Sequence, residues 1–289
     1  MDYEGNIIRP PSEAHSILLQ VTLGCSHNKC SFCGAYTDKR FGIKSPEIVH
    51  KDILFAAKHC RRQRRLFLCD GDALILPQAR LLEILADIRE HLPWVLRVGT
   101  YASAKSLKSK TDEELAELRD AGIGILYMGL ESGDDTILKA MNKHGDSAAI
   151  IEQGRRARQA GFKLNVTVIN GLGGEERSME HARATARALS EMDPEQIGAL
   201  SLMLVPDTPL HDQYERGEFV LPDARGMLLE IREMLAGLNL TKGLFLANHA
   251  SNYLPLKVRI PSGKDKALAE IDAALAGDRG LTPEWMRGL

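Results

Sequence analysis

The stretch RLFLCDGDALILPQARLLEILADIREHLPWVLRVG, residues 65–99, predicts a strand, a helix and a second strand. Short apolar runs stand at both ends, and the apolar residues between them recur with the spacing of an amphipathic helix. Two strands joined in this way are expected to pair in parallel through a right-handed crossover.

The same alternation extends along the chain in both directions. The predicted strands are 17–22, 65–70, 94–99, 124–130, 163–169 and 197–205. The predicted helices between them are 46–60, 78–92, 112–122, 148–161 and 179–192. A closed eight-stranded barrel needs about 250 residues, whereas the repeats end near residue 215. We therefore predict an α/β fold, a partial (β/α)6 TIM-type barrel with its ligands at the C-terminal ends of the strands.

The predicted barrel occupies residues 16–221 and follows an N-terminal extension, residues 1–15. The alternation is expected to stop after Pro222, where a small α+β extension, residues 222–289, caps the barrel near the substrate. The extension has predicted helices at 223–237 and 264–276 and a short strand at 243–248.

The composition is that of an ordinary globular protein. A net charge of −2 over 289 residues supplies no overall attraction to nucleic acid or anionic membrane. No window approaches the roughly 18 apolar residues of a membrane span, and the N-terminus lacks the features of a secretory signal. We expect a cytoplasmic protein with no membrane partner and no clear nucleic-acid partner. The basic run 61–65 is expected to be a solvated helix end.

Three of the five cysteines, Cys25, Cys30 and Cys33, lie in the loop after the first predicted strand. An odd count of clustered thiols favours metal ligation over a disulfide framework. Three thiolates can ligate three irons of a cubane cluster and leave the fourth iron open. A structural zinc site that includes His27 and a ferredoxin-like carrier remain as alternatives. Cys60 and Cys69 are expected to be small buried hydrophobic residues.

The spacing of these cysteines, C-x4-C-x2-C, resembles the C-x3-C-x2-C motif of the radical S-adenosylmethionine (SAM) superfamily, with one residue more. The resemblance spans residues 16–215 and is to the branch with oxygen-independent coproporphyrinogen oxidases and elongator-type enzymes. It implies a [4Fe–4S] cluster on Cys25, Cys30 and Cys33, and SAM as a second cofactor. It also implies that Phe32 approaches the adenine, although Phe32 could be a hydrophobic anchor.

Two further segments carry the resemblance after later strands. Gly71, Asp72 and Ala73 stand where the family has its GGE segment, whose carbonyl oxygens accept hydrogen bonds from the ammonium group of SAM. The segment MGLESGDDTILKAMNKHGD also resembles the family. In the family, the residue that corresponds to Glu131 contacts SAM, and the residue that corresponds to Lys143 pairs with the SAM carboxylate. The alternatives are an N-cap partner for Glu131 and a solvated surface charge for Lys143.

The segment NVTVINGLGGEE resembles the family's adenine-binding segment. Gly171, followed by two glycines at 173–174, matches its glycines, and Asn165 and Thr167 share a strand face from which they could reach the ribose. Val205 is in a position to line the adenine. The glycines could also serve only a turn that needs positive φ.

The resemblance implies reductive cleavage of SAM to methionine and a 5′-deoxyadenosyl radical, which takes hydrogen from a substrate. A low-potential donor of the flavodoxin or ferredoxin type would supply the electron. The alternatives are a non-catalytic iron–sulfur carrier or redox sensor, and a transferase that moves a methyl or 3-amino-3-carboxypropyl group. The absence of a second cysteine cluster or an RNA-binding domain favours a small-molecule substrate.

Position alone suggests where the substrate binds. Residues after the third strand or in the polar segment 247–264 could line its site; they are Tyr101, Ser103, His249, Asn252, Tyr253, Lys257 and Arg259, with Arg97 inside the third strand. The alternative for segment 247–264 is a hairpin-like cover with an Asn-rich turn.

Overall fold

The structure is a computed structural model that describes residues 1–288. Its strands are β1 (Ile17–Gln20), β2 (Thr22–Leu23), β3 (Gly42–Ile43), β4 (Arg65–Cys69), β5 (Arg97–Ala102), β6 (Ile123–Glu131), β7 (Lys163–Asn170), β8 (Gln196–Ser201), β9 (Gly243–Ala247) and β10 (Leu256–Ile260). Its α-helices are α1 (Pro46–His59), α2 (Gln78–His91), α3 (Ala104–Lys108), α4 (Asp112–Asp120), α5 (Asp135–Ala140), α6 (Ser147–Gln159), α7 (Ser178–Met192), α8 (Pro209–Glu215), α9 (Ala224–Gly237) and α10 (Lys264–Ala276).

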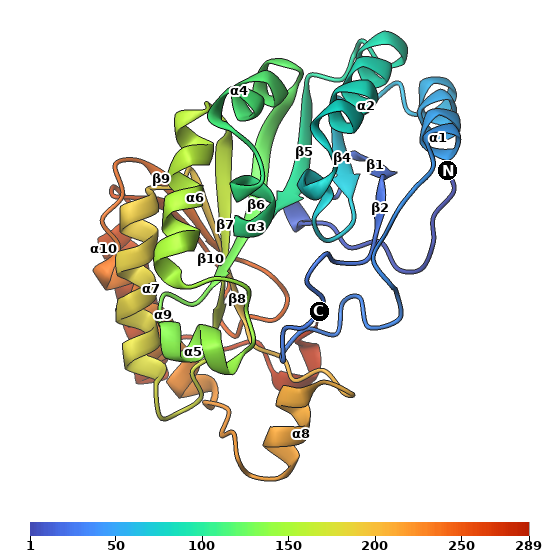
Figure 1. The fold of residues 1–289 in the computed structure, drawn as a ribbon. Helices are drawn as coiled ribbons and strands as arrows, with labels where there is room; N and C mark the ends of the chain where they lie inside the picture. The colour runs from blue at the N-terminus through green and yellow to red at the C-terminus, as the bar shows by residue number, and fades with distance from the viewer. Residues whose placement is uncertain (289) are drawn as a thin grey trace. The chain divides into compact units, whose positions relative to one another are not determined.

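Eight strands form one sheet in the order β1-β4-β5-β6-β7-β8-β9-β10 (Figure 1). The pairings β1–β4, β4–β5, β5–β6, β7–β8 and β8–β9 are parallel, and β9–β10 is antiparallel. The short strands β2 and β3 pair separately and antiparallel. A mostly parallel sheet with helices between its strands confirms the predicted α/β class.

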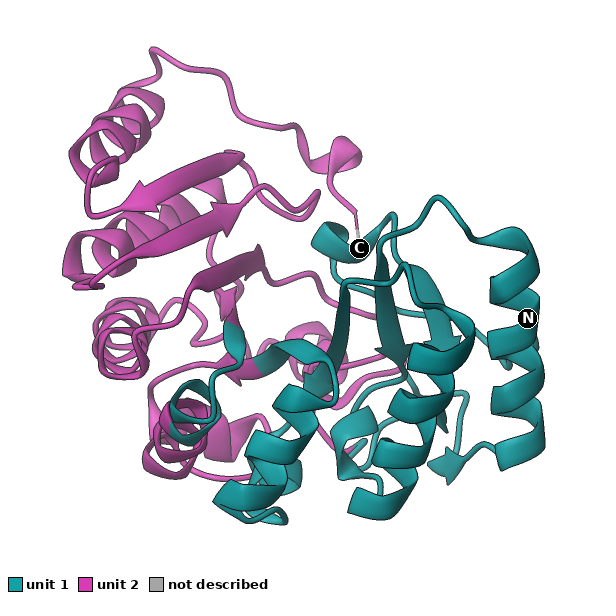
Figure 2. Cartoon of the chain, turned by 90° about the horizontal axis from the view of Figure 1, so that it is seen from above, with its two compact units in different colours: residues 1–28, 35–128, 156–164 teal, residues 29–34, 129–155, 165–289 magenta. Residues whose placement is uncertain are grey.

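The chain divides into two compact units (Figure 2). Unit 1 comprises residues 1–28, 35–128 and 156–164, and unit 2 comprises residues 29–34, 129–155 and 165–289.

In unit 1, the strands β1, β4 and β5 lie side by side, and α1 contacts both β1 and α2. Leu66, Phe67 and Leu68 of β4 are fully buried. A central parallel strand is covered on both faces, which explains its unbroken apolar sequence. Ser45 caps the start of α1, where its hydroxyl accepts a hydrogen bond from the amide of Ile48 at 3.4 Å.

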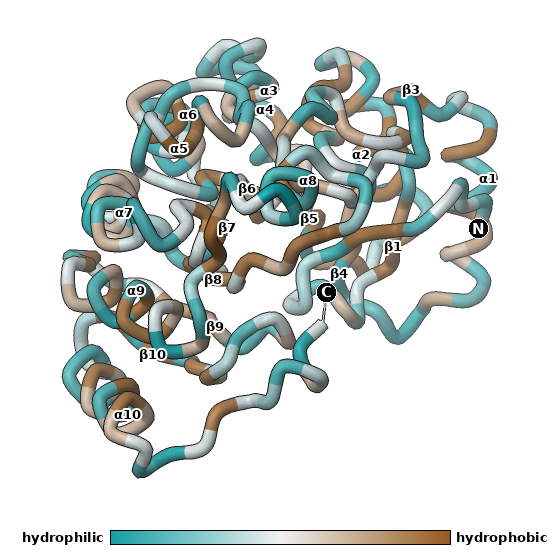
Figure 3. The backbone as a smooth tube through the Cα atoms, turned by 90° about the horizontal axis from the view of Figure 1, so that it is seen from below, coloured by the Kyte–Doolittle hydropathy of each residue, from teal (hydrophilic) through white to brown (hydrophobic). Residues whose placement is uncertain are grey.

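In unit 2, helix α9 contacts α7 and α10. Its inward face buries Met227, Ile231, Met234 and Leu235. Figure 3 shows a hydrophobic run within strand β7, which agrees with the complete burial of Val166 and Val168. The face opposite these valines carries Asn165 and Thr167 together with Ile169.

Two predicted strands differ from the observed ones. The strand expected at 94–99 begins at Arg97 instead. Trp94 donates its indole N–H to the carbonyl of Cys60 at 3.2 Å, and Leu96 is 79% exposed, so these residues do not join the buried strand. The strand expected at 197–205 ends at Ser201.

The alternation of strands and helices also continues beyond Pro222, which the sequence did not predict. The short strand expected at 243–248 is present as β9, which pairs in parallel with β8, and β10 extends the sheet by one more strand. The amphipathic helix α9, which packs against α7, connects β8 to β9 and so allows the two strands to pair in parallel. Within residues 1–288, no helix is both long enough and apolar enough to cross a lipid bilayer.

Candidate functional site

The three clustered cysteines are partly exposed and belong to a segment that both units share. Cys25 falls in unit 1, and Cys30 and Cys33 fall in unit 2. Within residues 1–288, no three His, Cys, Asp or Glu side chains are grouped in the manner of metal ligands. The assignment of these cysteines to a cluster therefore stays a prediction that rests on the donor set and its spacing.

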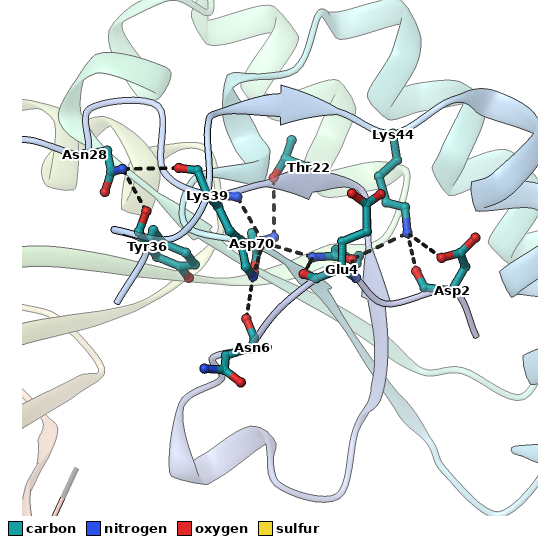
Figure 4. Close-up of polar contacts among 11 residues, drawn as sticks. Asp2, Glu4, Asn6, Thr22, Asn28, Tyr36, Lys39, Lys44 and Asp70 are labelled. Atoms are coloured by element: carbon teal, nitrogen blue, oxygen red, sulfur yellow. Dashed lines mark hydrogen bonds and ion pairs between the residues drawn. The ribbon is translucent and has the colours of Figure 1, made fainter. Parts of the chain in front are cut away.

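In unit 1, the carboxylate of Asp70 organises the chain just before Cys25 (Figure 4). Asp70 is fully buried, and its Oδ2 accepts hydrogen bonds from the amide of Gly24 and from Gln20 Nε2, each at 3.0 Å. The ammonium of Lys39 lies 3.3 Å from the same oxygen. Asp70 is not among the site residues predicted from the sequence, although a charged residue at the end of an apolar strand is a signal for such a role.

Gly71 allows the end of β4 to approach the first cysteine closely. Its amide donates to the carbonyl of Gly24 at 3.1 Å. A Cβ atom at Gly71 would lie 2.9 Å from Cys25 Cβ and 2.9 Å from a ring carbon of Tyr36. A glycine is therefore required at this position, as expected where a backbone segment passes closely. The donor set and this close packing fit an iron–sulfur ligand loop.

Asp72 links the cysteine loop to the end of the next strand. Its Oδ2 accepts hydrogen bonds from the hydroxyls of Ser26 at 2.9 Å and Ser103 at 2.7 Å. Burial raises the pKa of Asp72 above its ordinary value. Ala73 is fully buried at the start of a short 3-10 turn. The segment 71–73 thus lies at the C-terminal end of β4, in contact with the loop that carries Cys25.

In unit 2, the segment that carries Cys30 and Cys33 is fastened to two helices. The amide of Ser31 donates to the carbonyl of Met141 at 2.9 Å, and the amide of Leu210 donates to the carbonyl of Ser31 at 2.9 Å. These bonds hold the segment beside the end of α5 and the start of α8.

Two residues predicted to meet the adenine lie in this part of unit 2. Phe32 is partly buried and packs against a hydrophobic core cluster. A Cβ at Gly34 would lie 2.5 Å from Val205 Cγ1, which places Val205 beside the residue that follows Cys33.

Glu131 and Lys143 form an ion pair at the C-terminal end of β6. Lys143 Nζ donates to Glu131 Oε1 at 2.8 Å, and Glu131 Oε2 is buried and has no hydrogen-bond partner among residues 1–288. A Cβ at Gly129 would overlap the Glu131 carboxylate, so glycine makes room for the pair. Asp134 caps α5, which removes the alternative in which Glu131 serves that helix as a cap partner.

The backbone of Glu131 is also unusual. Its φ of 63° lies in the left-handed region, which non-glycine residues seldom adopt and which is concentrated at functional sites. The Glu131 oxygen offers a hydrogen-bond acceptor, and the Lys143 ammonium beside it offers a donor. A zwitterionic amino acid needs an acceptor for its ammonium group and a donor for its carboxylate.

The segment after β7 contains Gly171 at φ 86°. Its amide donates to Glu230 Oε1 at 2.5 Å. On the preceding strand, Asn165 and Thr167 share a face, as predicted; Thr167 is half-buried, and Asn165 is buried and donates to Gln196 Oε1 at 3.1 Å.

Some substrate-site candidates have polar atoms that are already engaged. Asn252 is 2% exposed, accepts from Ser201 Oγ at 3.0 Å and donates to the carbonyl of Ala199 at 3.0 Å. Tyr253 donates to Glu284 Oε2 at 2.6 Å. Both residues fasten the segment after β9 to the rest of unit 2, as the cover alternative anticipates.

The remaining candidates differ in exposure. His249 is half-buried and contacts Ser251 Oγ at 2.9 Å, and burial lowers its pKa. Tyr101 meets Phe67 edge-on, with ring centroids 5.0 Å apart. The side chains on the outer face of the edge strand β10 are exposed; they are Lys257 and Arg259. Arg97 pairs with the buried carboxylate of Glu13.

A comparison with protein families identifies the class. Residues 19–189 match the radical SAM superfamily, which is more than half of the chain, so the chain belongs to this superfamily. The family binds a [4Fe–4S] cluster and SAM, and its general reaction is SAM cleavage at the cluster, driven by an electron donor. Membership implies an enzyme.

Individual relatives are distant. An uncharacterized protein of Methanocaldococcus jannaschii is 26% identical over 70% of this chain and 65% of its own length. The oxygen-independent coproporphyrinogen III oxidase of Escherichia coli is 24% identical over 65% of this chain and 42% of its own length. The chain therefore spans less than two thirds of these curated relatives.

Solved structures share the fold at low sequence identity. The Escherichia coli coproporphyrinogen III oxidase has a TM-score of 0.56 at 19% identity, covering 76% of this chain and 51% of that chain. The Elp3 protein of Methanocaldococcus infernus has a TM-score of 0.54 at 11% identity, covering 92% and 64%. Both show that the fold is shared.

Proposed function

We propose that this chain cleaves SAM reductively to methionine and a 5′-deoxyadenosyl radical, which abstracts a hydrogen atom from a small substrate. The observation that carries the proposal beyond the family's general reaction is the Glu131–Lys143 ion pair. Its cation suits the SAM carboxylate, and its buried, unsatisfied carboxylate oxygen suits a donor group of SAM.

The other roles follow from where the residues lie. Cys25, Cys30 and Cys33 would hold a [4Fe–4S] cluster, which would supply the electron for reductive cleavage of SAM. The carbonyl groups of segment 71–73 would accept hydrogen bonds from the SAM ammonium. Residues near the nucleoside would be Phe32, Val205, Asn165, Thr167 and Gly171.

We extend the proposal to the substrate and the electron donor. His249 is the strongest substrate-site candidate, since the side chains of Asn252 and Tyr253 already hold the cover in place. Tyr101 remains a candidate at the end of β5. A cytoplasmic flavodoxin or ferredoxin would supply the electron. A carrier or sensor without SAM chemistry is disfavoured, because it has no use for the Glu131–Lys143 pair.

The test is anaerobic turnover with dithionite and SAM after cluster reconstitution. We expect 5′-deoxyadenosine from the wild-type chain and from a Cys60→Ala control, because Cys60 lies at the end of α1, outside the cysteine loop. We expect none from Cys30→Ala. Undiminished 5′-deoxyadenosine from Cys30→Ala, or none from the wild type, would overturn the proposal.

A further inference from the structure

Unit 2 contains two fully buried ionisable side chains that the proposed chemistry does not use. They are His181 on α7 and Glu230 on α9, both 0% exposed, with His181 Nε2 3.5 Å from Glu230 Oε1. Buried ionisable groups are costly unless they are hydrogen-bonded, so their partners indicate what they do.

His181 connects the ends of strands β6 and β7. Its Nδ1 lies 2.7 Å from the hydroxyl of Ser132, the residue after Glu131, and its Nε2 lies 3.0 Å from the carbonyl of Ile169, two residues before Gly171. Ser132 Oγ also accepts from the amide of Asp134 at 3.0 Å, so its proton is available for His181.

These contacts define the tautomer of His181. Burial lowers its pKa to about 4, so the ring is neutral near pH 7 and carries one proton. A carbonyl can only accept, which places that proton on Nε2 and leaves Nδ1 to accept from Ser132. The pair with Glu230 is consequently not an ion pair.

Glu230 holds the glycine segment from the side of α9. Its Oε1 accepts from the amide of Gly171 at 2.5 Å, and its Oε2 contacts the hydroxyl of Ser178 at 2.5 Å. The left-handed backbone of Gly171 directs this amide away from the sheet ladder. Without Glu230, the amide would be a buried donor with no acceptor.

We propose that His181 and Glu230 are positioning residues for SAM, which hold the glycine segment after β7 at a defined distance from Glu131 after β6. Helix α9, which the sequence assigned to a capping extension, thereby becomes part of the SAM site. This inference rests on the proposed function, because it assigns SAM to those two segments.

The test compares SAM affinity by calorimetry in the cluster-reconstituted chain. Glu230→Met keeps the size of the side chain but removes the acceptor for Gly171, so SAM should bind about tenfold more weakly. Glu230→Gln still accepts from the Gly171 amide through its oxygen and can donate to Ser178, so its affinity should stay within about twofold of wild type.

The chain offers a matched control on the same two helices. Glu233 of α9 pairs with Arg183 of α7 at 2.6 Å on the surface, so Glu233→Met should leave SAM affinity unchanged. A second control separates the halves of the ligand. Free L-methionine lacks the nucleoside, so its binding should be the same in Glu230→Met and wild type.

The outcomes separate the two proposals. The inference is overturned if Glu230→Met binds SAM as tightly as the wild type does. It is also overturned if Glu233→Met loses as much SAM affinity as Glu230→Met does. In both cases the proposed function stands. A wild-type chain that binds no SAM would overturn both. Should Glu230→Met fail to fold, nitrogen NMR of the wild type decides, with the His181 signal assigned by its loss in His181→Gln. We expect the neutral Nε2–H form near pH 7, and a charged or Nδ1–H ring would refute the arrangement.

Discussion

Glu131 shows how one residue can carry several independent signs of function. Its backbone is left-handed, its carboxylate is paired on one oxygen and unsatisfied on the other, and Gly129 leaves room for it. Strained backbones and unsatisfied buried oxygens are rare in folded proteins, and strain is concentrated at functional sites.

Gly129→Ala tests the importance of that space. The added methyl group would overlap the Glu131 carboxylate and lie 2.9 Å from Lys143 Nζ. Both atoms are ends of flexible side chains, so we expect the fold to survive and SAM affinity to fall about tenfold. Calorimetry measures this, with Gly280→Ala as the control, because nothing lies within 4 Å of a Cβ at Gly280. Unchanged SAM affinity in Gly129→Ala would contradict the assignment of SAM to this pair.

His181 predicts a specific dependence of stability on pH. Its pKa is lowered from 6.5 to about 4 by burial, so below pH 6.5 the unfolded chain binds a proton that the folded chain does not. Stability should therefore fall by about 3 kcal/mol as the pH decreases from 6.5 to 4. Glu230 has the opposite effect on stability, because burial raises its pKa from 4.5 to about 7. The stability that its protonated form contributes is lost as the pH rises from 4.5 to about 7.

The variant His181→Gln isolates the histidine term, since glutamine can accept from Ser132 and donate to Ile169 but does not titrate. Urea unfolding should show a smaller loss of stability on acidification in His181→Gln than in wild type. Parallel pH profiles for the two proteins would mean that His181 is not a buried neutral ring.

At the scale of single elements, the end of β4 governs the cysteine loop in unit 1. Asp70 binds the amide of Gly24, Gly71 packs on Cys25, and Asp72 binds Ser26. Three successive residues of one strand end therefore determine the path of the loop before and after the first cysteine.

Gly71→Ala should disturb the loop because its new methyl group meets Cys25 Cβ at 2.9 Å and Cys25 Cα at 3.1 Å. The backbone cannot turn away as a side chain can, so we expect iron and sulfide bound after reconstitution to fall by about half or more. Iron and sulfide analysis measures this, again with Gly280→Ala as the control. A full cluster content in Gly71→Ala would show that the loop tolerates the displacement.

At the scale of the whole molecule, the C-terminal part of the chain completes the sheet instead of only covering it. Strand β9 pairs with β8, and α9 packs on α7 and buries Met227, Ile231 and Met234. Each such side chain contributes about 1.5–3 kcal/mol when it is buried.

A chain that stops after residue 221 should therefore lose cooperative unfolding, because the edge of β8 and the apolar face of α7 would be bare. Circular dichroism during urea unfolding measures this. A sharp transition in the shortened chain would show that residues 16–221 are an independent domain, as the sequence alone predicted.

The sequence by itself determined the long helices, the class of fold and the family, but not the short helices α3, α5 and α8. The long helices begin and end within one or two residues of their predicted limits, because caps such as Ser45 and Thr111 and the apolar period are local signals. The spacing of the cysteines and the twelve-residue separation of Glu131 and Lys143 are also local, and they placed the candidate site, although its SAM roles remain predictions.

Only the tertiary structure decided the partners of Asp70, His181 and Glu230 and the place of β9 in the sheet. The hydrogen bonds of these three side chains join residues as far as 59 positions apart in the sequence, and β9 pairs with a strand more than 40 positions earlier. Such contacts form when packed elements bring distant residues together. They leave no periodic trace near the residues that make them.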